Sequence, residues 1–438
     1  MLSSLKNQMF RQGLSSLRTP RFFSRQIVFP EHKPAKITVY NSNVGILQDI
    51  LGLFNKYNIN MISIESKIRN KRSEGIEAVD FYVTYDDPVE QYHFNDLIFE
   101  LNKREINMYP LPIPRCPGFP IHISDLDNMQ LVKLESEVVN PDDPLYSDKE
   151  YAVRRKYLES LNTGYKMGSP IKRLEYTEQE TATWTYIWDK LMPQIKEHGC
   201  APFVKYLENF VEMGIFKRNE IPQLDDLNRY LIKKNNWRIK PVNGIISQRQ
   251  YLNILAFRTF PSTQYIRHHS TPEYTPEPDI CHEFFGHMAA FADPAICDLS
   301  QKIGLLSLGA TDSQLKILGA IYWYTIEFGV VMENGKRKFY GGGIASSFKE
   351  IENMNNCTDM RKLDLVNDNV VPDSVVVQDV QPHFYYANNF REVVDQLDEF
   401  GRMMGKPFKT HYSFLNNQIV SDTALEFMED KDAASRYE

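Results

Sequence analysis

The segment Pro276-Glu-Pro-Asp-Ile-Cys-His-Glu-Phe-Phe-Gly-His-Met288 contains two histidines, His282 and His287, five positions apart, with Glu283 directly after the first. On a regular α-helix, residues at this spacing point about 140° away from each other. The imidazoles share a face only if His282 lies at a helix start or if a π-bulge intervenes. Two imidazoles and one carboxylate from elsewhere would hold a divalent iron and leave open coordination positions. Structural histidines are the alternative, but Glu283 and Gly286, which permits close packing, favour a metal site.

The missing carboxylate is predicted in a second segment. Residues 320–332 resemble an almost wholly apolar helix whose single charged residue is Glu327. An ionised carboxylate in such surroundings costs on the order of several kcal/mol unless it is paired or bound to a cation. Pairing with an arginine is the alternative, and we predict that Glu327 is the third metal ligand.

Residues 34–109 have the pattern of a small α+β module, with alternating apolar residues in the strands and helical spacing between them. The predicted order is strand 36–40, helix 44–57, strand 60–67, strand 77–85, helix 91–103 and a short strand ending near Tyr109. This βαββαβ order is that of a ferredoxin-like fold.

Five prolines between Pro110 and Pro120 predict a stiff linker at residues 110–124 that continues neither helix nor sheet. Residues 125–409 then become predominantly helical, with apolar residues at i, i+3 and i+4. The clearest predicted helices cover residues 148–161, 178–198, 201–213 and 223–234. Residues 410–438 are predicted to form a short oligomerisation arm and a polar tail.

Composition argues against several classes of protein. Of the 438 residues, 42% are hydrophobic and 24% charged, which is typical of a folded chain. A net charge of −7 without a basic cluster argues against a nucleic-acid partner. No run of eighteen apolar residues is present, so we expect no membrane span. Five cysteines without a Cys-x-x-Cys pair predict neither a disulfide framework nor a structural zinc site.

The first thirty residues contain five basic residues and no Asp or Glu, and their apolar residues recur at helical spacing. This pattern is typical of an amphipathic transit segment, which predicts the mitochondrial matrix. A disordered basic tail on a cytoplasmic protein is the alternative. Arg21-Phe-Phe-Ser24 resembles a presequence cleavage site, which favours import.

Several longer motifs together resemble the core of the pterin-dependent aromatic amino acid hydroxylases. The motifs cover residues 221–224, 262–268, 274–287, 321–329 and 340–348. The resemblance extends over about residues 37–420. It implies an ACT-like regulatory domain, a predominantly helical catalytic domain of this family's type and a short C-terminal β-arm. It also implies a non-haem Fe(II) held by His282, His287 and Glu327.

The resemblance further implies a tetrahydropterin, such as tetrahydrobiopterin, in contact with one segment. The cofactor-binding residues implied are Gly244, Ile246, Gln248, Tyr251 and Glu283. The cofactor would stack on Tyr251, where the family more often has phenylalanine. A tyrosine keeps the aromatic face but adds a hydroxyl that must find a hydrogen-bond partner when buried.

For the substrate, the resemblance implies that Arg267 grips the carboxylate of an amino acid through a bidentate pair. A structural ion pair is the alternative for this arginine. Trp323 would line the slot for the substrate ring. The remaining pocket residues implied are Thr275, Pro278, Gly343 and Ser346.

Two positions indicate which aromatic amino acid is hydroxylated. Trp323 matches the tryptophan of phenylalanine hydroxylases, and Val377 matches an apolar position where tyrosine hydroxylases place an acid. We therefore expect L-phenylalanine to be converted to L-tyrosine with O₂. The alternatives are tryptophan or tyrosine hydroxylation, a zinc hydrolase with Glu283 as base, and an amino-acid sensor without catalysis.

Regulation and assembly are the last expectations. Gly45 and Ile64-Glu65-Ser66 resemble the ligand loop of ACT domains, which implies phenylalanine as an allosteric ligand. Residues 410–422 match the β-arm that the family uses for dimerisation. The sixteen residues after them lack the apolar heptads of a tetramer-forming helix, so we expect a homodimer.

Overall fold

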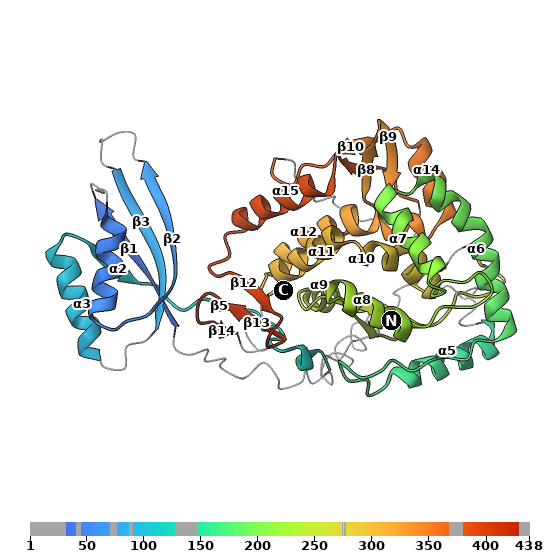
Figure 1. Cartoon of the computed structure of the whole chain (residues 1–438), viewed down its shortest axis with the longest axis horizontal. Helices are drawn as coiled ribbons and strands as arrows, with labels where there is room; N and C mark the ends of the chain where they lie inside the picture. The colour runs from blue at the N-terminus through green and yellow to red at the C-terminus, as the bar shows by residue number, and fades with distance from the viewer. Residues whose placement is uncertain are drawn as a thin grey trace, which may run out of the picture. The chain divides into compact units, whose positions relative to one another are not determined.

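The computed structural model describes residues 32–40, 45–70, 77–86, 91–127, 147–273, 275, 277–367 and 380–428. These residues form two compact units (Figure 1). Unit 1 takes the chain up to Phe119 together with 407–410 and the residues from Ser421 onward, and unit 2 takes 120–406 and 411–420. Over the described ranges, no helix combines the length and the apolar character needed to cross a membrane.

Unit 1 is built on a four-stranded sheet. Its elements are β1 (His32–Tyr40), α2 (Ile46–Lys56), β2 (Met61–Asn70), β3 (Glu77–Asp86), α3 (Gln91–Lys103) and β4 (Asn107–Pro110). The strand order is β2-β3-β1-β4, with antiparallel neighbours, and both helices cover one face (Figure 1). The predicted βαββαβ order is therefore confirmed.

Alternation along the strands builds the core of unit 1. Ile37 lies opposite Phe81 in the β1–β3 register, and both are buried beneath the two helices. From α2, Leu53 and Phe54 complete this core. The helix begins after Gly45, whose φ of 97° is a left-handed conformation that favours glycine.

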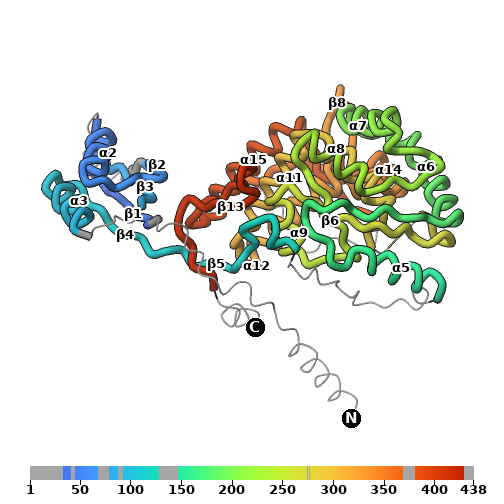
Figure 2. The backbone as a smooth tube through the Cα atoms, turned by 60° about the horizontal axis from the view of Figure 1, so that its bottom comes forward, coloured from blue at the N-terminus to red at the C-terminus, as the bar shows by residue number. Residues whose placement is uncertain are grey.

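The proline-rich segment contains one short strand, which corrects the expectation that it continues no sheet. β5 (Arg115–Cys116) pairs in parallel with β14 (Glu426–Phe427), so that the C-terminal segment runs beside it (Figure 2). The amides of Glu426 and Met428 donate to the carbonyls of Pro114 and Cys116 at 3.0 Å each. Proline lacks an amide hydrogen but keeps its carbonyl, so it can accept in a ladder although it cannot donate.

Unit 2 is predominantly helical. Its longer helices are α5 (Lys149–Asn162), α6 (Glu178–His198), α7 (Ala201–Glu212), α8 (Leu224–Asn235), α9 (Gln248–Leu255), α11 (Pro294–Ser307), α12 (Asp312–Tyr322), α14 (Phe348–Asn356) and α15 (Phe390–Met403). The shorter ones are a 3₁₀ helix, η2 (Ile123–Asp127), together with α10 (Ala289–Phe291) and α13 (Gly342–Ala345). The four helices predicted from sequence agree with α5 to α8 within one residue at each end.

Two π-helices interrupt this helical unit: η3 (His282–Met288) and η4 (Trp323–Glu327). The expectation of one helix over residues 320–332 is wrong beyond Glu327, because Val330 starts a strand. A Cβ at Gly329 would lie 2.0 Å from the Thr325 carbonyl oxygen, so the chain turns tightly there. Beyond this glycine, Val330 and Val331 pair with neighbouring strands, which suits their β-branched side chains.

Small sheets complete unit 2. β8 (Val330–Glu333), β9 (Lys336–Phe339), β10 (Met360–Lys362) and β11 (Phe384–Ala387) form one sheet in the order β10-β11-β8-β9. β6 (Arg238–Pro241) pairs in parallel with β7 (Thr259–Ser262). Near the C-terminus, β12 (Thr410–Ser413) and β13 (Gln418–Ser421) form a two-stranded sheet within the segment predicted to be a β-arm.

Candidate active site

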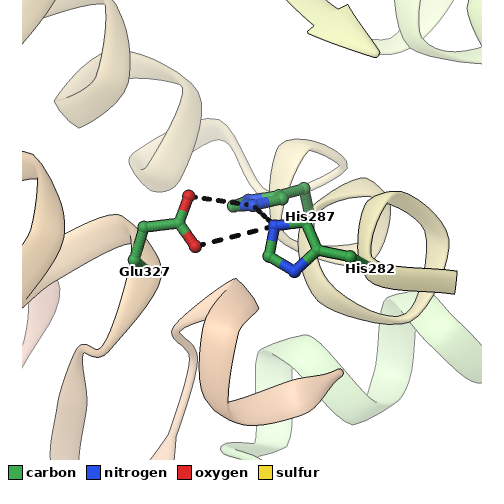
Figure 3. A group of neighbouring side chains, drawn as sticks. All are labelled: His282, His287 and Glu327. Carbon is green, nitrogen blue, oxygen red and sulfur yellow. Dashed lines mark hydrogen bonds and ion pairs between the residues drawn. The ribbon is translucent and has the colours of Figure 1, made fainter. Parts of the chain in front are cut away.

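Three side chains from the two π-helices converge in unit 2. The Nε2 atoms of His282 and His287 lie 3.0 Å apart. Glu327 places Oε1 3.1 Å from the Nε2 of His287 and Oε2 3.7 Å from that of His282. Figure 3 shows the two rings and the carboxylate turned toward one another. One ligand atom from each residue lies within 4.8 Å of the others, which is the arrangement of a three-ligand metal site.

The π-helical geometry of η3 explains how the unusual spacing works. His282 and His287 are the first and sixth residues of this π-helix, and their ring centroids lie 4.7 Å apart. A π-helix bonds residue i to residue i+5, so it places residues five apart on one face. Of the two alternatives that the sequence left open, a helix start at His282 or a π-bulge, the structure shows π geometry.

A serine fixes the orientation of His282. Nδ1 of His282 lies 2.9 Å from Oγ of Ser346, and this hydroxyl donates to the Gly342 carbonyl at 2.8 Å. The serine oxygen therefore accepts a hydrogen from Nδ1, which leaves Nε2 with its lone pair toward Glu327. Ser346 was predicted to shape the substrate pocket, and in the structure its hydroxyl contacts an iron-ligand candidate.

Glycines allow the backbones of η3 and α13 to pack in direct contact. A Cβ added at Gly286 would lie 2.6 Å from the Gly342 carbonyl oxygen. A Cβ added at Gly342 would lie 2.5 Å from Cε1 of His287. The close approach predicted for Gly286 is confirmed, whereas the role of Gly342 in seating His287 was missed.

The electrostatics favour an anionic Glu327 between two imidazoles. Burial opposes ionisation of Glu327, but the neighbouring His287 and His282 hold the pKa of this carboxyl below its usual value. Burial lowers the pKa of His282 to about 4, so this ring is neutral near pH 7. Burial would also lower the pKa of His287, but the Glu327 carboxylate outweighs it and raises that pKa.

The donor set fits iron. Two imidazole nitrogens and one carboxylate oxygen are the ligands of a facial triad with open positions. In the described part of the chain, the ion-pair partners of Glu327 are the two histidines, so the predicted alternative of an arginine partner is not what the structure shows. Nδ1 of His287 is buried there without a hydrogen-bond partner.

A cavity of about 140 Å³ opens beside the triad. Five of the residues predicted to bind cofactor or substrate line it: Gly244, Ile246, Tyr251, Pro278 and Glu283. Other predicted residues lie outside this lining: Gln248, Arg267, Thr275, Trp323, Gly343 and Ser346. Thr263 and Phe260 line it too and were not predicted.

Glu283 is a second buried carboxyl in this cavity. It is 3% exposed, and Oε1 accepts a hydrogen bond from the Thr263 amide at 3.1 Å. Burial raises the pKa of Glu283 to about 8, so the group carries its proton at neutral pH. A neutral carboxylic acid can donate a hydrogen bond to a ligand, whereas Glu327 cannot.

Tyr251 projects from α9 into the same cavity, and its hydroxyl has the partner that the sequence required. The hydroxyl groups of Tyr251 and Tyr322 are hydrogen-bonded, and the two rings meet edge to face with centroids 5.1 Å apart. Phe260 packs edge to face on another side of Tyr251, at 6.2 Å. Tyr322, the last residue of α12, was missed because a tyrosine in an apolar helix resembles ordinary core.

Arg267 forms a buried ion pair with Asp279, as the structural alternative predicted. Its Nε and Nη2 donate to the two carboxylate oxygens of Asp279 at 2.9 and 2.8 Å. Burial opposes this charge, but Arg267 holds the pKa of Asp279 below its usual value. Asp279 also accepts the His282 amide at 3.0 Å, so it connects the arginine to the metal site. A substrate contact for Arg267 stays a prediction.

Trp323 and Gly343 both contact Phe328, whereas Thr275 contacts Glu277. Nε1 of Trp323 donates to Oε1 of Gln381 at 3.0 Å, and its ring packs on Phe328 with centroids 4.7 Å apart. A Cβ at Gly343 would lie 2.7 Å from Cζ of Phe328. The hydroxyl of Thr275 donates to the Glu277 carbonyl at 2.7 Å. Val377 lies outside the described residues.

Gln248, which was predicted to bind the cofactor, packs against α12. A Cβ at Gly319 would lie 1.7 Å from Nε2 of Gln248, so the end of this flexible side chain rests directly on the glycine of α12. The contact joins α9, which carries Tyr251, to α12, which carries Tyr322.

Comparison with known proteins identifies the class of this protein. Residues 117–431 match the family model of the biopterin-dependent aromatic amino acid hydroxylases. The chain belongs to this family, and with its His-His-Glu group it is a pterin-dependent iron monooxygenase that acts on aromatic amino acids.

Individual relatives agree with this family. Protein henna of Drosophila melanogaster is 36% identical over 86% of this chain and 83% of its own length. The phenylalanine-4-hydroxylase of Dictyostelium discoideum is 35% identical over 85% of each chain. The tryptophan 5-hydroxylase of Xenopus laevis is 33% identical over 89% of this chain and 83% of its own.

A solved structure agrees with the fold. The cobalt-bound phenylalanine hydroxylase of Chromobacterium violaceum is 23% identical and has a TM-score of 0.50, over 61% of this chain and 94% of that chain. The catalytic fold is therefore that of the hydroxylase family.

Proposed function

We propose that this enzyme converts L-phenylalanine to L-tyrosine, with O₂ and tetrahydrobiopterin, at an Fe(II) held by His282, His287 and Glu327. The observation that carries the proposal is the convergence of these three side chains beside a cavity. When bound, iron and the tetrahydropterin supply the activation of O₂. The chain holds the ligands, positions the reactants and limits water.

We expect different cavity residues to make different contacts with the pterin. Tyr251 offers an aromatic ring, and Gly244, Ile246 and Glu283 belong to the same lining. Because Glu283 is protonated at neutral pH, it donates a hydrogen bond to an acceptor of the pterin ring. The match to the hydroxylase family favours this role over that of a general base in a zinc hydrolase.

The substrate is proposed to lie on the side of Arg267 and Trp323. Asp279 holds the guanidinium in one orientation, and the substrate carboxylate binds its remaining donors. Trp323, held by Gln381, packs against the substrate ring. An apolar slot rejects an added hydroxyl by only about 10²-fold, so some activity on other aromatic amino acids is expected.

An assay with three substrates tests this proposal. The enzyme is supplied with Fe(II), tetrahydrobiopterin and O₂, and kcat/KM is measured for phenylalanine, tryptophan and tyrosine. We expect phenylalanine to give the highest value. A higher value for tryptophan would overturn the proposed substrate, because a tryptophan hydroxylase is nearly as similar to this chain as the phenylalanine hydroxylases are.

We further propose that residues 34–109 are an ACT regulatory domain and that residues 125–409 perform catalysis. Support comes from the βαββαβ order of unit 1 and from Gly45, whose amide region at the start of α2 suits a carboxylate ligand. Phenylalanine would bind there and at residues 64–66. We expect a variant that begins at Asp125 to lose two properties of the full protein: the lag in its activity and the sigmoidal dependence of its rate on substrate concentration.

Homodimer formation through residues 410–422 is likewise proposed, with the β12–β13 pair as support. Sedimentation of the full chain and of a variant ending at Lys409 tests it, and we expect a dimer and a monomer respectively.

Import into the mitochondrial matrix rests on the basic, acid-free first thirty residues, which lie outside the described ranges. Cell fractionation with N-terminal sequencing of the recovered protein distinguishes import from a cytoplasmic location.

A further inference from the structure

Two side chains of α14, Glu350 and Asn353, hold the segment that leads into β11. The Gln381 amide donates to Oε1 of Glu350 at 2.9 Å, and the Gln381 carbonyl accepts from Nδ2 of Asn353 at 2.7 Å. The same Nδ2 donates to Oε2 of Glu350 at 3.2 Å. Both backbone polar groups of Gln381 are therefore bound by α14, and the two hydrogens of the Asn353 amide each have an acceptor.

The fold explains why side chains make these contacts. Gln381 lies three residues before β11 begins at Phe384, so it is outside the ladder of that strand. Glu350 and Asn353 are three positions apart on α14, which places them on one face of the helix. Gln381 is 3% exposed and Glu350 is 7% exposed. Because a buried polar group without a partner is costly, these hydrogen bonds favour a single position of Gln381.

The side chain of Gln381 transmits this position to Trp323. Nε1 of Trp323 donates to Oε1 of Gln381 at 3.0 Å. The indole nitrogen can only donate, so the oxygen of the Gln381 amide group must face it. The indole also packs on Phe328, with ring centroids 4.7 Å apart, and it is only partly buried. The ring therefore keeps exposed surface for a ligand, whereas the residue that orients it is buried.

We propose that Glu350 is a positioning residue for substrate choice: through Gln381, it fixes the orientation of the Trp323 ring against which the substrate packs. The inference rests on the proposed function, in which Trp323 contacts the ring of L-phenylalanine. Contacts between aromatic rings depend on their geometry, so a turn of the indole changes how well each aromatic substrate fits. Glu350 therefore affects which amino acid is used rather than the binding of iron.

A double-mutant cycle on the full-length enzyme tests the proposal. Phenylalanine and tryptophan compete in the presence of Fe(II), tetrahydrobiopterin and O₂, and the ratio of their kcat/KM values is measured. The variants are Glu350→Gln, Trp323→Phe and the double variant. Glutamine is close to glutamate in volume, but its NH₂ group faces either the Gln381 amide or the Asn353 amide, so a hydrogen bond is lost.

The expected results are specific to a role through Trp323. Glu350→Gln should narrow the preference for phenylalanine by about two- to fivefold, the effect of one buried hydrogen bond. In the Trp323→Phe background, Glu350→Gln should have no further effect on the ratio. A phenylalanine side chain has no donor for Gln381, so the two substitutions interrupt the same contact and their effects do not add.

Matched controls separate positioning from loss of stability. Asp225 is another buried carboxylate, 4% exposed, and it accepts the Ile171 amide at 2.9 Å. Asp225→Asn should lower the melting temperature and leave the ratio unchanged. Asn353→Ala removes the other side chain that binds Gln381, so it should narrow the preference in the same direction. This variant also decides the question if Glu350→Gln does not fold.

The outcomes distinguish this inference from the proposed function. The positioning role is overturned, while the proposed function stands, if Glu350→Gln and Asn353→Ala leave the ratio unchanged. It is also overturned if the effects of Glu350→Gln and Trp323→Phe multiply. If the unmodified enzyme prefers tryptophan, the proposed substrate is wrong. A change of ratio in Glu350→Gln that disappears in the Trp323→Phe background would then still support the positioning role.

Discussion

The two π-helices that carry the ligand candidates are held in place by different forces. η3 is anchored by packing: Phe285 is fully buried and stacks on Trp184 at 4.8 Å, and the backbone of Gly342 meets Gly286. η4 ends at Glu327, and the carboxylate of this residue is held by polar contacts, 3.1 Å from Nε2 of His287 and 3.7 Å from Nε2 of His282. The histidine pair should therefore be sensitive to changes in volume, and the glutamate to the loss of donors.

This difference also fits the chemistry of the ligands. An imidazole is rigid and presents one nitrogen to the ion, so packing of the ring is sufficient to aim it. A carboxylate has two equivalent oxygens and a softer terminal torsion, so it needs polar partners. η3 therefore orients its imidazoles by packing, and η4 orients its carboxylate by polar contacts.

Removal of a ligand should have the largest effect and should separate the two segments. His287→Ala and Glu327→Ala should both lose bound iron and more than about 100-fold in activity, beyond the range of indirect effects. Without metal, His287→Ala should lower the free energy of unfolding by about 2–5 kcal/mol, because the ring is 1% exposed and packs on Phe260. Glu327→Ala should cost less, since it also removes a buried charge.

Metal analysis and denaturant unfolding of the metal-free proteins measure these effects. A metal-free Glu327→Ala protein that is less stable than His287→Ala would contradict the distinction between a packed and a hydrogen-bonded ligand.

A change of volume next to η3 should have the next largest effect. Gly342→Ala pushes a methyl group into the His287 ring, and we expect a loss of about 1–3 kcal/mol in unfolding free energy together with weaker iron binding. Gly52→Ala is the matched control, because its Cβ meets nothing within 4 Å in α2. It should stabilise by about 0.5–1 kcal/mol. Equal effects of the two substitutions would show that η3 is not held by packing.

Loss of the donor-acceptor pair at His282 should have a smaller and more local effect. Ser346→Ala removes the oxygen that accepts from Nδ1, and iron affinity should fall by about tenfold. The adjacent Ser347 caps α14 through the Glu350 amide. Ser347→Ala should therefore cost about 1 kcal/mol of stability and leave iron affinity unchanged. Isothermal titration with Fe(II) and thermal unfolding compare the two; equal iron affinities would contradict the role of Ser346.

Local patterns were sufficient to predict much of the fold. The strands and helices of unit 1 follow from alternation and helical spacing, and helices α5 to α8 follow from apolar residues at helical spacing. The triad could also be predicted, because a five-residue histidine spacing and a lone charge in an apolar segment are both costly without a metal. The prediction that the helix continues past Glu327 is wrong, because apolar valines occur in buried strands as well as in helices.

The parts that could not be predicted depend on contacts between distant segments. Gly342 meets His287, and Tyr322 meets Tyr251, across more than fifty residues of sequence. Nothing in the local pattern of either partner indicates the other. Asp279 lies three residues before His282 in the sequence, but only the fold brings it next to Arg267.

The smallest expected effect concerns substrate choice at Trp323, the first residue of η4. Trp323→Phe should narrow the preference for phenylalanine over tryptophan by about two- to tenfold in kcat/KM, because one aromatic contact contributes about 0.5–1.5 kcal/mol. Gln381→Leu keeps the indole and removes only its acceptor, so it should shift the same ratio in the same direction by less. Iron content should stay unchanged in both variants, since neither side chain touches the triad ligands through a hydrogen bond in the described residues. Competition assays with both amino acids measure the ratio. An unchanged ratio in Trp323→Phe would mean that η4 contributes a ligand to the site but no part of the substrate slot.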